Sequence, residues 1–423
     1  MKNKKTVILF GAGACLPWNS PTTSELTDLV RRSGFKTFSN IYITEFIYQK
    51  LLASGYKEAD INFETIINVI EEMIVYYSHF NNENKTPSLL NCFFTPIFED
   101  EIFNFSIKGG VEKHGYELDI PKEVNYPFSK HSYYNETPKQ FFLQHLIAEL
   151  ISSINGKISS YAYHTPGNSV IDIETDESKL FIKWMKSLIR SSSLRLYTLN
   201  YDRVFKILLE RSGIGIFEGF DCGEYIDYSA WLRADIPKIL SDSDSNIYYN
   251  LHGSAFWRVE AVDSKQLPNP ELFLTASPVL TVNHNHATLQ MEKGKTIMIT
   301  NIITGYQKAQ KTLVTPLKQM QASFDKDCCF ANDIFIIGYS LSDEHINETI
   351  KTAIRHNPKV KITIVDPYFL KNGLDYQLAI KIFPFKNDGE VQPTSVDKDL
   401  HIFYNEVFKL HTIEFKEFLK LVR

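Results

Sequence analysis

Four short apolar runs constrain the fold of this 423-residue chain most strongly, because each is followed by small or polar residues and then by a helix-like stretch. Parallel strands that are buried on both faces have such continuous runs, rich in β-branched and aliphatic residues. The alternation of strand, turn and helix predicts an α/β protein with a doubly wound parallel sheet. The four runs are Thr6–Phe10, Leu194–Leu199, Ile334–Ile337 and Lys361–Val365.

Three weaker segments are expected to add to the same sheet. Tyr248–Leu251 is a fifth strand candidate, because it is short, apolar and ends in polar residues. Ile402–Tyr404 and His411–Phe415 are expected to form structure at the sheet's edge.

The stretch between the first and second runs has a different character. Asn62–Tyr77 and Pro138–Ile154 show helical periodicity and few strand signals. We therefore predict an α/β domain made of residues 1–33 and 191–423, interrupted by a mostly helical insertion at residues 34–190. We expect the insertion to provide oligomer or regulatory contacts.

Composition narrows the class of protein. The net charge of -5 gives no sign of a global nucleic-acid-binding surface. The five cysteines include no C-x-x-C pair, which argues against a disulfide framework or a zinc ribbon and suits a reducing compartment. No apolar run approaches the roughly 20 residues that a membrane span needs. We expect a cytoplasmic protein that holds no zinc and binds neither membrane nor nucleic acid directly.

A glycine turn, Gly11-Ala12-Gly13, follows the first run. Glycine permits a tight turn and lets backbone N–H groups approach a pyrophosphate closely. Leu16 stands where the third glycine of G-x-G-x-x-G belongs, so the usual dinucleotide fingerprint is incomplete. Taken alone, the turn fits a phosphate cradle and a simple strand-to-helix turn equally well.

Polar residues follow the next two strand candidates. Asn200 lies where the second run ends, the edge at which open α/β sheets bind ligands. Asp202 could instead cap the following helix. His252 follows the fifth candidate and precedes Gly253. A histidine with an ordinary pKa of about 6.5 can act as a general base, although a single histidine is more often a packed or surface residue.

The last two runs end in similar turns. Gly338 permits a close approach and Ser340 offers a hydroxyl, while Ser342 or Asp343 could cap the next helix. Asp366 ends the last run, and a strand-end acid can accept a hydrogen bond from a ribose hydroxyl.

The four motifs, in this order, resemble the sirtuin-like superfamily. They are GAG with a following Pro-Thr, then T-x-N-Y-D, then L-H-G, and then G-Y-S-L-S-D-x-H-I-N. The match covers about residues 6–33, 194–260 and 332–368. The resemblance implies a Rossmann-like fold that binds NAD, as the substrate, in an extended groove.

The resemblance also implies roles for individual residues. Asn200 would hold the attacking water or the ribose, His252 would be the catalytic base, and Asp202 would bind the nicotinamide amide. Cys15 replaces the usual serine with a more weakly hydrogen-bonding thiol. The other cofactor-binding positions that it implies are Gly11, Ala12, Gly13, Cys15, Pro21, Thr22, Gly338, Ser340 and Asp366.

Departures from the pattern indicate a branch of the family. Protein-deacylating sirtuins carry a zinc module built on two C-x-x-C pairs, and this chain has none. A long helical insertion resembles the bacterial anti-phage defence branch, whose members cleave NAD. The expected activity is therefore that of an NAD glycohydrolase, which releases nicotinamide and ADP-ribose. Its leaving group departs neutral, so one base and one positioning amide suffice without a general acid.

Two other functions remain open. A catalytically silent sensor would bind NAD or an ADP-ribose-type nucleotide, and Cys15 is the one departure that favours it. A protein deacylase is the third and weakest candidate. NAD cleavage would have to be gated, so we expect a homo-oligomer, and the resemblance suggests a HerA-type ATPase or translocase as a separate partner.

Overall fold

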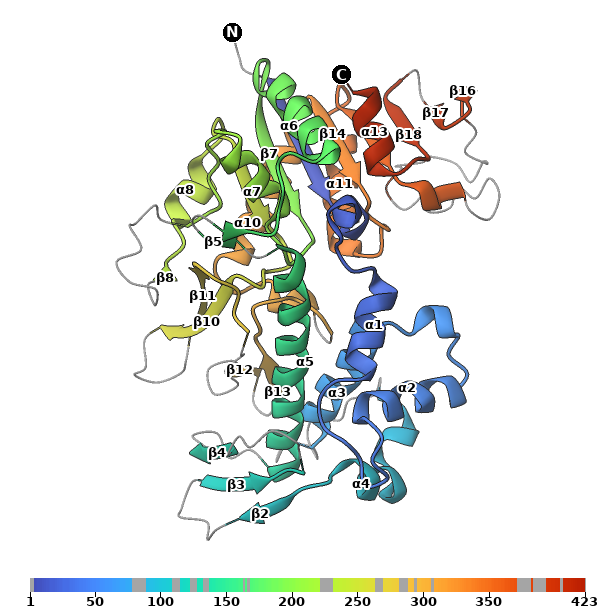
Figure 1. Ribbon diagram of the computed structural model, residues 1–423, viewed down its shortest axis with the longest axis vertical. Coiled ribbons are helices and arrows are strands. Elements are labelled where there is room, and N and C mark those ends of the chain that lie inside the picture. Colours follow the sequence, from blue (N-terminus) through green and yellow to red (C-terminus); the bar gives the residue numbers. More distant parts are fainter. Residues whose placement is uncertain are drawn as a thin grey trace.

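The computed structural model of the chain is shown in Figure 1. It describes residues 4–77, 89–108, 115–121, 128–131, 137–162, 164–165, 168–220, 231–262, 269–280, 288–292, 295–305, 308–370, 382, 393–403 and 406–422. Within these ranges, no helix is both long enough and apolar enough to cross a membrane.

An eight-stranded sheet forms the centre of the molecule's upper part in Figure 1. Its spatial order is β16-β17-β18-β15-β14-β1-β7-β9, and the strands from β18 to β9 run parallel. In this sheet, β17 pairs in the antiparallel sense with both β16 and β18. The strands are β1 (Lys4–Phe10), β7 (Ser192–Thr198), β9 (Ile247–Asn250), β14 (Asp333–Ile337), β15 (Lys361–Val365), β16 (Ser395–Asp397), β17 (Leu400–Phe403) and β18 (Phe408–His411).

The parallel strands have the topology of a dinucleotide-binding sheet. Numbered in chain order, the six of them lie in the spatial order 3-2-1-4-5-6. The direction of winding reverses between β1 and β14, which are direct neighbours paired from Thr6↔Asp333 to Phe10↔Ile337. The predicted doubly wound, Rossmann-like parallel sheet is confirmed.

The segment His411–Phe415, which was expected to add structure at the sheet's edge, joins the last strand of the main sheet to a helix. The strand there is β18, which ends at His411, and helix α13 begins at Phe415. Phe408 and Leu410 are buried alternately along β18, which pairs with β15 on one side and β17 on the other. Pairing on both sides and this alternation of buried residues favour a strand at Phe408–His411.

Helices cover both faces of the sheet. On one face, α6, α7 and α13 pack together around a cluster of aromatic rings that includes Phe10, Phe205 and Phe415. On the other, α10 packs against α8, α11 and β9. These helices are α6 (Asp176–Ile189), α7 (Val204–Arg211), α8 (Ile236–Ser241), α10 (Leu317–Cys329), α11 (Glu344–His356) and α13 (Phe415–Leu421).

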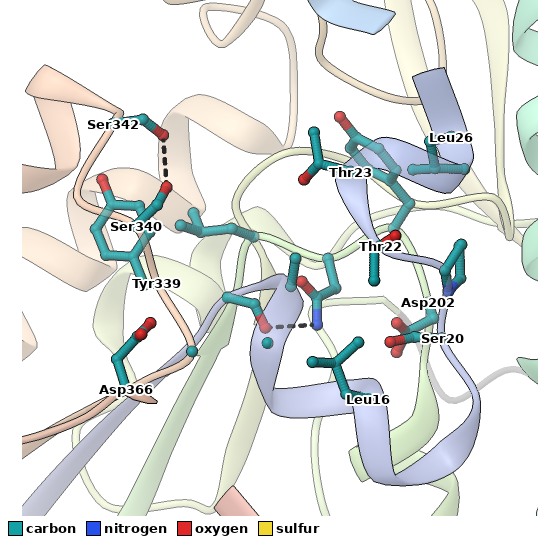
Figure 2. A pocket seen from close by; sticks show the side chains of 18 of the residues that line it. Leu16, Ser20, Thr22, Thr23, Leu26, Asp202, Tyr339, Ser340, Ser342 and Asp366 are labelled. Carbon is teal, nitrogen blue, oxygen red and sulfur yellow. Dashed lines mark hydrogen bonds between the residues drawn. The ribbon is translucent and has the colours of Figure 1, made fainter. Parts of the chain in front are cut away.

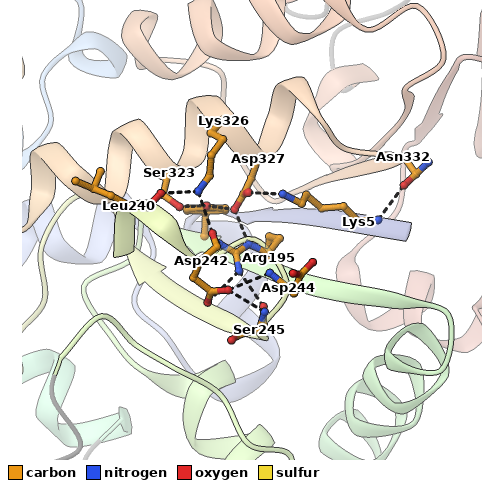
Figure 3. Close-up of polar contacts among 11 residues, drawn as sticks. Lys5, Arg195, Leu240, Asp242, Asp244, Ser245, Ser323, Lys326, Asp327 and Asn332 are labelled. Atoms are coloured by element: carbon orange, nitrogen blue, oxygen red, sulfur yellow. Dashed lines mark hydrogen bonds and ion pairs between the residues drawn. The ribbon is translucent and has the colours of Figure 1, made fainter. Parts of the chain in front are cut away.

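A buried ionic cluster fixes β7 to α10 (Figure 3). The guanidinium of Arg195 is fully buried, and its Nε lies 2.5 Å from Oδ2 of Asp327. Asp327 also accepts hydrogen bonds from Lys5 Nζ at 2.7 Å and from the Tyr197 hydroxyl at 2.6 Å. Because all three donors converge on one buried carboxylate, the cluster joins β1, β7 and α10 inside the fold.

The segment between α1 (Thr23–Arg31) and the second strand of the main sheet extends to the lower part of the molecule (Figure 1). The described residues of the predicted insertion at 34–190 form helices, a three-stranded antiparallel sheet and a short two-stranded hairpin. Helix α6 falls within this range but packs on β7 and α13 of the α/β part. The insertion's elements are α2 (Ile43–Ala53), α3 (Phe63–Tyr76), α4 (Pro96–Ile102), β2 (Ser106–Lys108), β3 (Gly115–Asp119), β4 (Phe128–His131) and α5 (Pro138–Ala162).

Small elements occupy the remaining described residues. A second antiparallel sheet has the order β10-β11-β8, and two hairpins pair β12 with β13 and β5 with β6. These elements are β5 (His164–Thr165), β6 (Asn168–Ser169), β8 (Trp231–Leu232), β10 (Trp257–Val262), β11 (Asn269–Thr275), β12 (Thr288–Glu292), β13 (Lys295–Met298) and the short helix α9 (Lys308–Lys311).

Candidate active site

A cavity of about 650 Å³ lies at the carboxyl edge of the main sheet (Figure 2). Its floor comes from the turns that follow β1, β7, β9, β14 and β15. The cavity therefore sits where the winding of the sheet reverses, which is the position at which doubly wound sheets bind their ligands.

Eleven of the twelve predicted site residues line this one cavity. They come from five different strand ends and from the loop before α1. Cys15 does not line the cavity; it is fully buried behind the turn after β1. The lining residues are Gly11, Ala12, Gly13, Pro21, Thr22, Asn200, Asp202, His252, Gly338, Ser340 and Asp366.

The glycine turns after β1 and β14 lie directly against each other. Gly11 N donates to Ile337 O at 2.9 Å, and Gly13 N donates to Gly338 O at 3.0 Å. A Cβ on Gly11 would come within 2.4 Å of Gly338 O, and one on Gly338 within 2.3 Å of Ala14 N. Gly338 also has a φ of +60°. Close approach of two backbones thus explains these glycines, and the Gly13 amide is used within the protein.

Asn200 links the turn after β7 to the turn after β1. Its Nδ2 donates to Gly11 O at 3.0 Å and to Cys15 Sγ at 3.2 Å. Asn250, the last residue of β9, donates from Nδ2 to the backbone carbonyl oxygen of Asn200 at 3.0 Å. The first two bonds fix the side-chain amide of Asn200 at the floor of the cavity, and the third holds its backbone.

Asp202 is buried and has donors at both carboxylate oxygens. Its Oδ1 accepts from Val204 N at 3.0 Å, at the start of α7, and from Cys15 Sγ at 3.7 Å. Its Oδ2 accepts from the Tyr161 hydroxyl at 2.7 Å. Burial raises the pKa of Asp202, although these hydrogen bonds partly oppose the shift. Asp202 thus supports the start of α7, although the N-cap of this helix is Arg203 and not Asp202 as the helix-capping alternative expected, and it also lines the cavity.

His252 is a neutral base at the end of β9. Burial, together with the nearby Lys308 and His345, lowers its pKa to about 3, whereas Asp343 opposes the shift. Among the described residues, Nε2 of His252 has no hydrogen-bond partner. Because the ring is neutral and this nitrogen has no partner in the described part of the chain, His252 is able to accept a proton from a bound molecule.

The other predicted residues have local partners. Thr22 caps α1, since its hydroxyl accepts from Glu25 N at 3.2 Å in a capping box. Ser340 donates to Ser342 Oγ at 3.1 Å, as Figure 2 shows. Asp366 Oδ1 accepts from Tyr368 N at 2.7 Å.

The sequence did not indicate that the predicted insertion lines the same cavity. Tyr161 and Ile158 reach it from the last turns of α5, and Glu64 reaches it from the first turn of α3. Lys308 Nζ lies 3.0 Å from Glu64 Oε1 and 3.0 Å from Asp343 Oδ1. Burial lowers the pKa of Lys308, but these two carboxylates raise it overall, so the lysine is charged.

No metal centre is evident in the part of the chain that the structure describes. There, no three or more His, Cys, Asp or Glu side chains are grouped so as to hold a metal ion.

The chain was compared with curated proteins, with solved structures and with models of protein families. No curated protein matches the chain. Two solved structures from work on the structural basis of sirtuin substrate affinity are 12% and 10% identical, with TM-scores of 0.35 and 0.34, and cover 100% of this chain and 93% and 92% of theirs. A structure of Sir2Tm bound to a propionylated peptide is 11% identical, with a TM-score of 0.34 and coverages of 100% and 92%.

At these TM-scores the likeness to solved structures supports no statement about the chain. The match to a family model is more specific, because it falls on the residues that line the cavity. The model of the SIR2-like domain matches residues 195–373, so the chain contains a region similar to that domain, and this region supplies Asn200, Asp202, His252 and the turns after β14 and β15.

Proposed function

We propose that the chain is an NAD glycohydrolase that cleaves NAD to nicotinamide and ADP-ribose. The observation that carries this proposal is the convergence of the predicted residues, from five strand ends, on one cavity at the reversal point of a dinucleotide-binding sheet. The match of residues 195–373 to the SIR2-like domain supports the choice of NAD as the substrate.

Three side chains carry the proposed reaction. Asp202 accepts a hydrogen bond from the nicotinamide carboxamide, which orients the leaving group. Nicotinamide leaves as a neutral molecule, so the site needs no general acid. Asn200, held by Gly11 and Cys15, positions the water or the ribose hydroxyls. His252 takes the proton of the water that attacks C1′ of the ribose.

The low pKa of His252 is compatible with this role. A water molecule that attacks an oxocarbenium-like centre loses its proton readily, so a weak base suffices. Asp343, which raises the pKa of His252, is the carboxylate placed to stabilise the protonated ring.

We further propose that this activity depletes NAD in bacterial anti-phage defence, in the cytoplasm where NAD is found. Unregulated NAD cleavage would kill the cell that makes the enzyme. The segment at residues 34–190 offers a surface for a homo-oligomer or for a HerA-type translocase, and assembly would then control the cavity that α3 and α5 help to line.

The second candidate is a sensor that binds NAD, or another ADP-ribose-type nucleotide, without cleaving it. The observation that favours it is the pKa of about 3 at His252, because such a histidine is a poor base towards an ordinary water molecule.

The test is nicotinamide release by the purified full chain incubated with NAD, followed by chromatography. We expect Asn200→Ala and His252→Ala to abolish release, while His356→Ala, an exposed histidine at the end of α11, leaves it unchanged. Turnover that survives both site substitutions would exclude this site. NAD binding by calorimetry without any product would favour the sensor, and O-acyl-ADP-ribose formed with an acetyl-lysine peptide would favour a deacylase.

Regulation requires a separate measurement. The same variants are compared in cells during phage infection, with NAD measured over time. We expect NAD to fall only with the unaltered chain, and full activity of a lone monomer in vitro would argue against control by assembly.

A further inference from the structure

Tyr161 connects the predicted insertion to the leaving-group end of the cavity. It lies in the last turn of α5, a helix of 25 residues, and lines the cavity together with Ile158 one turn earlier. Its hydroxyl donates to Oδ2 of Asp202 at 2.7 Å. Neither α5 nor its tyrosine belongs to the four sequence motifs or to the region that matches the SIR2-like domain.

A tyrosine bound to a carboxylate is often a purely structural feature, and the chain holds such a case. Tyr48 donates to Glu58 Oε1 at 3.0 Å within the insertion, and neither residue lines the cavity. Tyr161 differs because both members of its pair line the cavity.

Among the described residues, two donors bind one carboxylate oxygen of Asp202 and one donor binds the other. Val204 and Cys15 donate to Oδ1, whereas Tyr161 is the donor at Oδ2. Burial raises the pKa of Tyr161, so the phenol keeps its proton and remains a donor to Asp202. A phenol oxygen that donates its proton still accepts hydrogen bonds through its lone pairs. The pair therefore presents acceptors at Oδ2 and at the phenol oxygen.

We propose that Tyr161 is a leaving-group-binding residue that, together with Asp202, recognises the carboxamide of nicotinamide. This inference rests on the proposed function, because it assigns one end of NAD to the Tyr161 end of the cavity. The N–H groups of the carboxamide donate to Asp202 Oδ2 and to the phenol oxygen, while the phenol donates to the carboxylate. The predicted insertion thus supplies part of the recognition of the substrate.

Tyr161→Phe tests the inference, since it removes the hydroxyl and keeps the ring. We expect the inhibition constant of nicotinamide and the KM for NAD to rise about tenfold or more, as for loss of a hydrogen bond in a charged network. ADP-ribose lacks the carboxamide, so its dissociation constant by calorimetry should change by less than about twofold. Tyr48→Phe, which loses the same type of bond outside the cavity, should change none of the three.

Two results would overturn the inference. One is unchanged nicotinamide inhibition in Tyr161→Phe. The other is an equal weakening of nicotinamide and ADP-ribose, which would mean that the substitution loosens the whole cavity.

A failure of this inference can be distinguished from a failure of the proposed function. If the unaltered chain releases no nicotinamide, nicotinamide is titrated by calorimetry into protein saturated with ADP-ribose. Binding that weakens in Tyr161→Phe upholds the inference although the glycohydrolase proposal falls. Absence of nicotinamide binding to the unaltered chain overturns the inference, whatever the outcome for NAD cleavage.

Discussion

Asn200 and Cys15 are joined by a hydrogen bond of 3.2 Å from the amide nitrogen to the thiol sulfur. The same sulfur lies 3.7 Å from Oδ1 of Asp202, to which its thiol donates. Burial raises the pKa of Cys15, as does the nearby Asp202 charge, so the thiol keeps its proton and can act as a donor. Although it does not line the cavity, Cys15 therefore positions two residues that do.

Substitutions at Cys15 should separate hydrogen bonding from space filling. We expect Cys15→Ala to slow nicotinamide release about tenfold, because Asn200 and Asp202 each lose a partner. Cys15→Ser keeps a donor and an acceptor, and we expect its rate to stay within about threefold of the unaltered chain. Cys92→Ala, at a cysteine outside the cavity, is the control. Equal rates for the Ala and Ser variants would show that Cys15 only fills space.

Gly338→Ala should destabilise the fold by about 3 kcal/mol or more, because its methyl group meets the backbone after β1 at a positive φ. Gly55 also has a positive φ, +93°, but nothing lies within 4 Å of a Cβ placed there. Gly55→Ala should therefore cost only the backbone strain, about 1 kcal/mol. Denaturant unfolding of both variants measures the difference, and equal losses would argue against the close contact of the two turns.

We expect substitution of Asp327 to lower the stability of the fold strongly, because this residue is at the centre of the buried ionic cluster. Asp327→Asn removes the charge that faces Arg195 and Lys5, and we expect a loss of about 3–5 kcal/mol in the free energy of unfolding. Glu417→Gln, in the exposed pair with Lys420, should change it by less than about 0.5 kcal/mol. A loss below about 1 kcal/mol for Asp327→Asn would mean that Asp242, whose Oδ2 lies 3.5 Å from Arg195, is sufficient to balance the guanidinium.

His252 should make stability depend on pH. Its pKa is about 3 in the folded protein and near 6.5 when unfolded, so between these values the unfolded chain binds the proton and the folded chain does not. Stability therefore falls as the pH is lowered through this window, and is restored above it. We expect His252→Asn to lose less stability than the unaltered chain between about pH 7 and pH 5.

Unfolding by urea at both pH values measures this difference. His345, His401 and His411 also have lowered pKa values and add to the slope, so the variant should flatten it only in part. An unchanged slope would show that His252 binds its proton equally well in the folded and the unfolded chain. The pH dependence of kcat/KM for NAD is a second measurement. As the pH is lowered, kcat/KM should not fall at the ordinary pKa of histidine.

The sheet could be predicted well from the sequence because each central strand is a short run of consecutive apolar residues. Val7, Ile8 and Leu9 are each fully buried, and a continuous apolar run of that kind has few alternatives to a central parallel strand. The sixth parallel strand was harder to predict. In β18 every second residue faces the interior, and a helix begins at Phe415, soon after this strand ends at His411.

The floor of the cavity could be predicted because parallel strands bring their carboxyl ends to one edge. Its walls could not. Tyr161 meets Asp202 across 41 residues of sequence, and Lys308 meets Glu64 across 244. Neither Tyr161 nor Lys308 stands in a motif, and only the packing of α3, α5 and α9 brings them to the site.

The central position of β1 has a consequence for how the protein is made. Its two neighbours begin at Ser192 and Asp333, so a ribosome releases β1 long before either partner exists, and non-local pairing of this kind is slow. A nascent chain that ends before Asp333 already carries Asn200 and His252, yet it lacks Gly338, Ser340 and Asp366. An interrupted translation product therefore holds the proposed reacting residues without the part of the cavity floor that follows β14 and β15, and should be harmless to the cell's NAD.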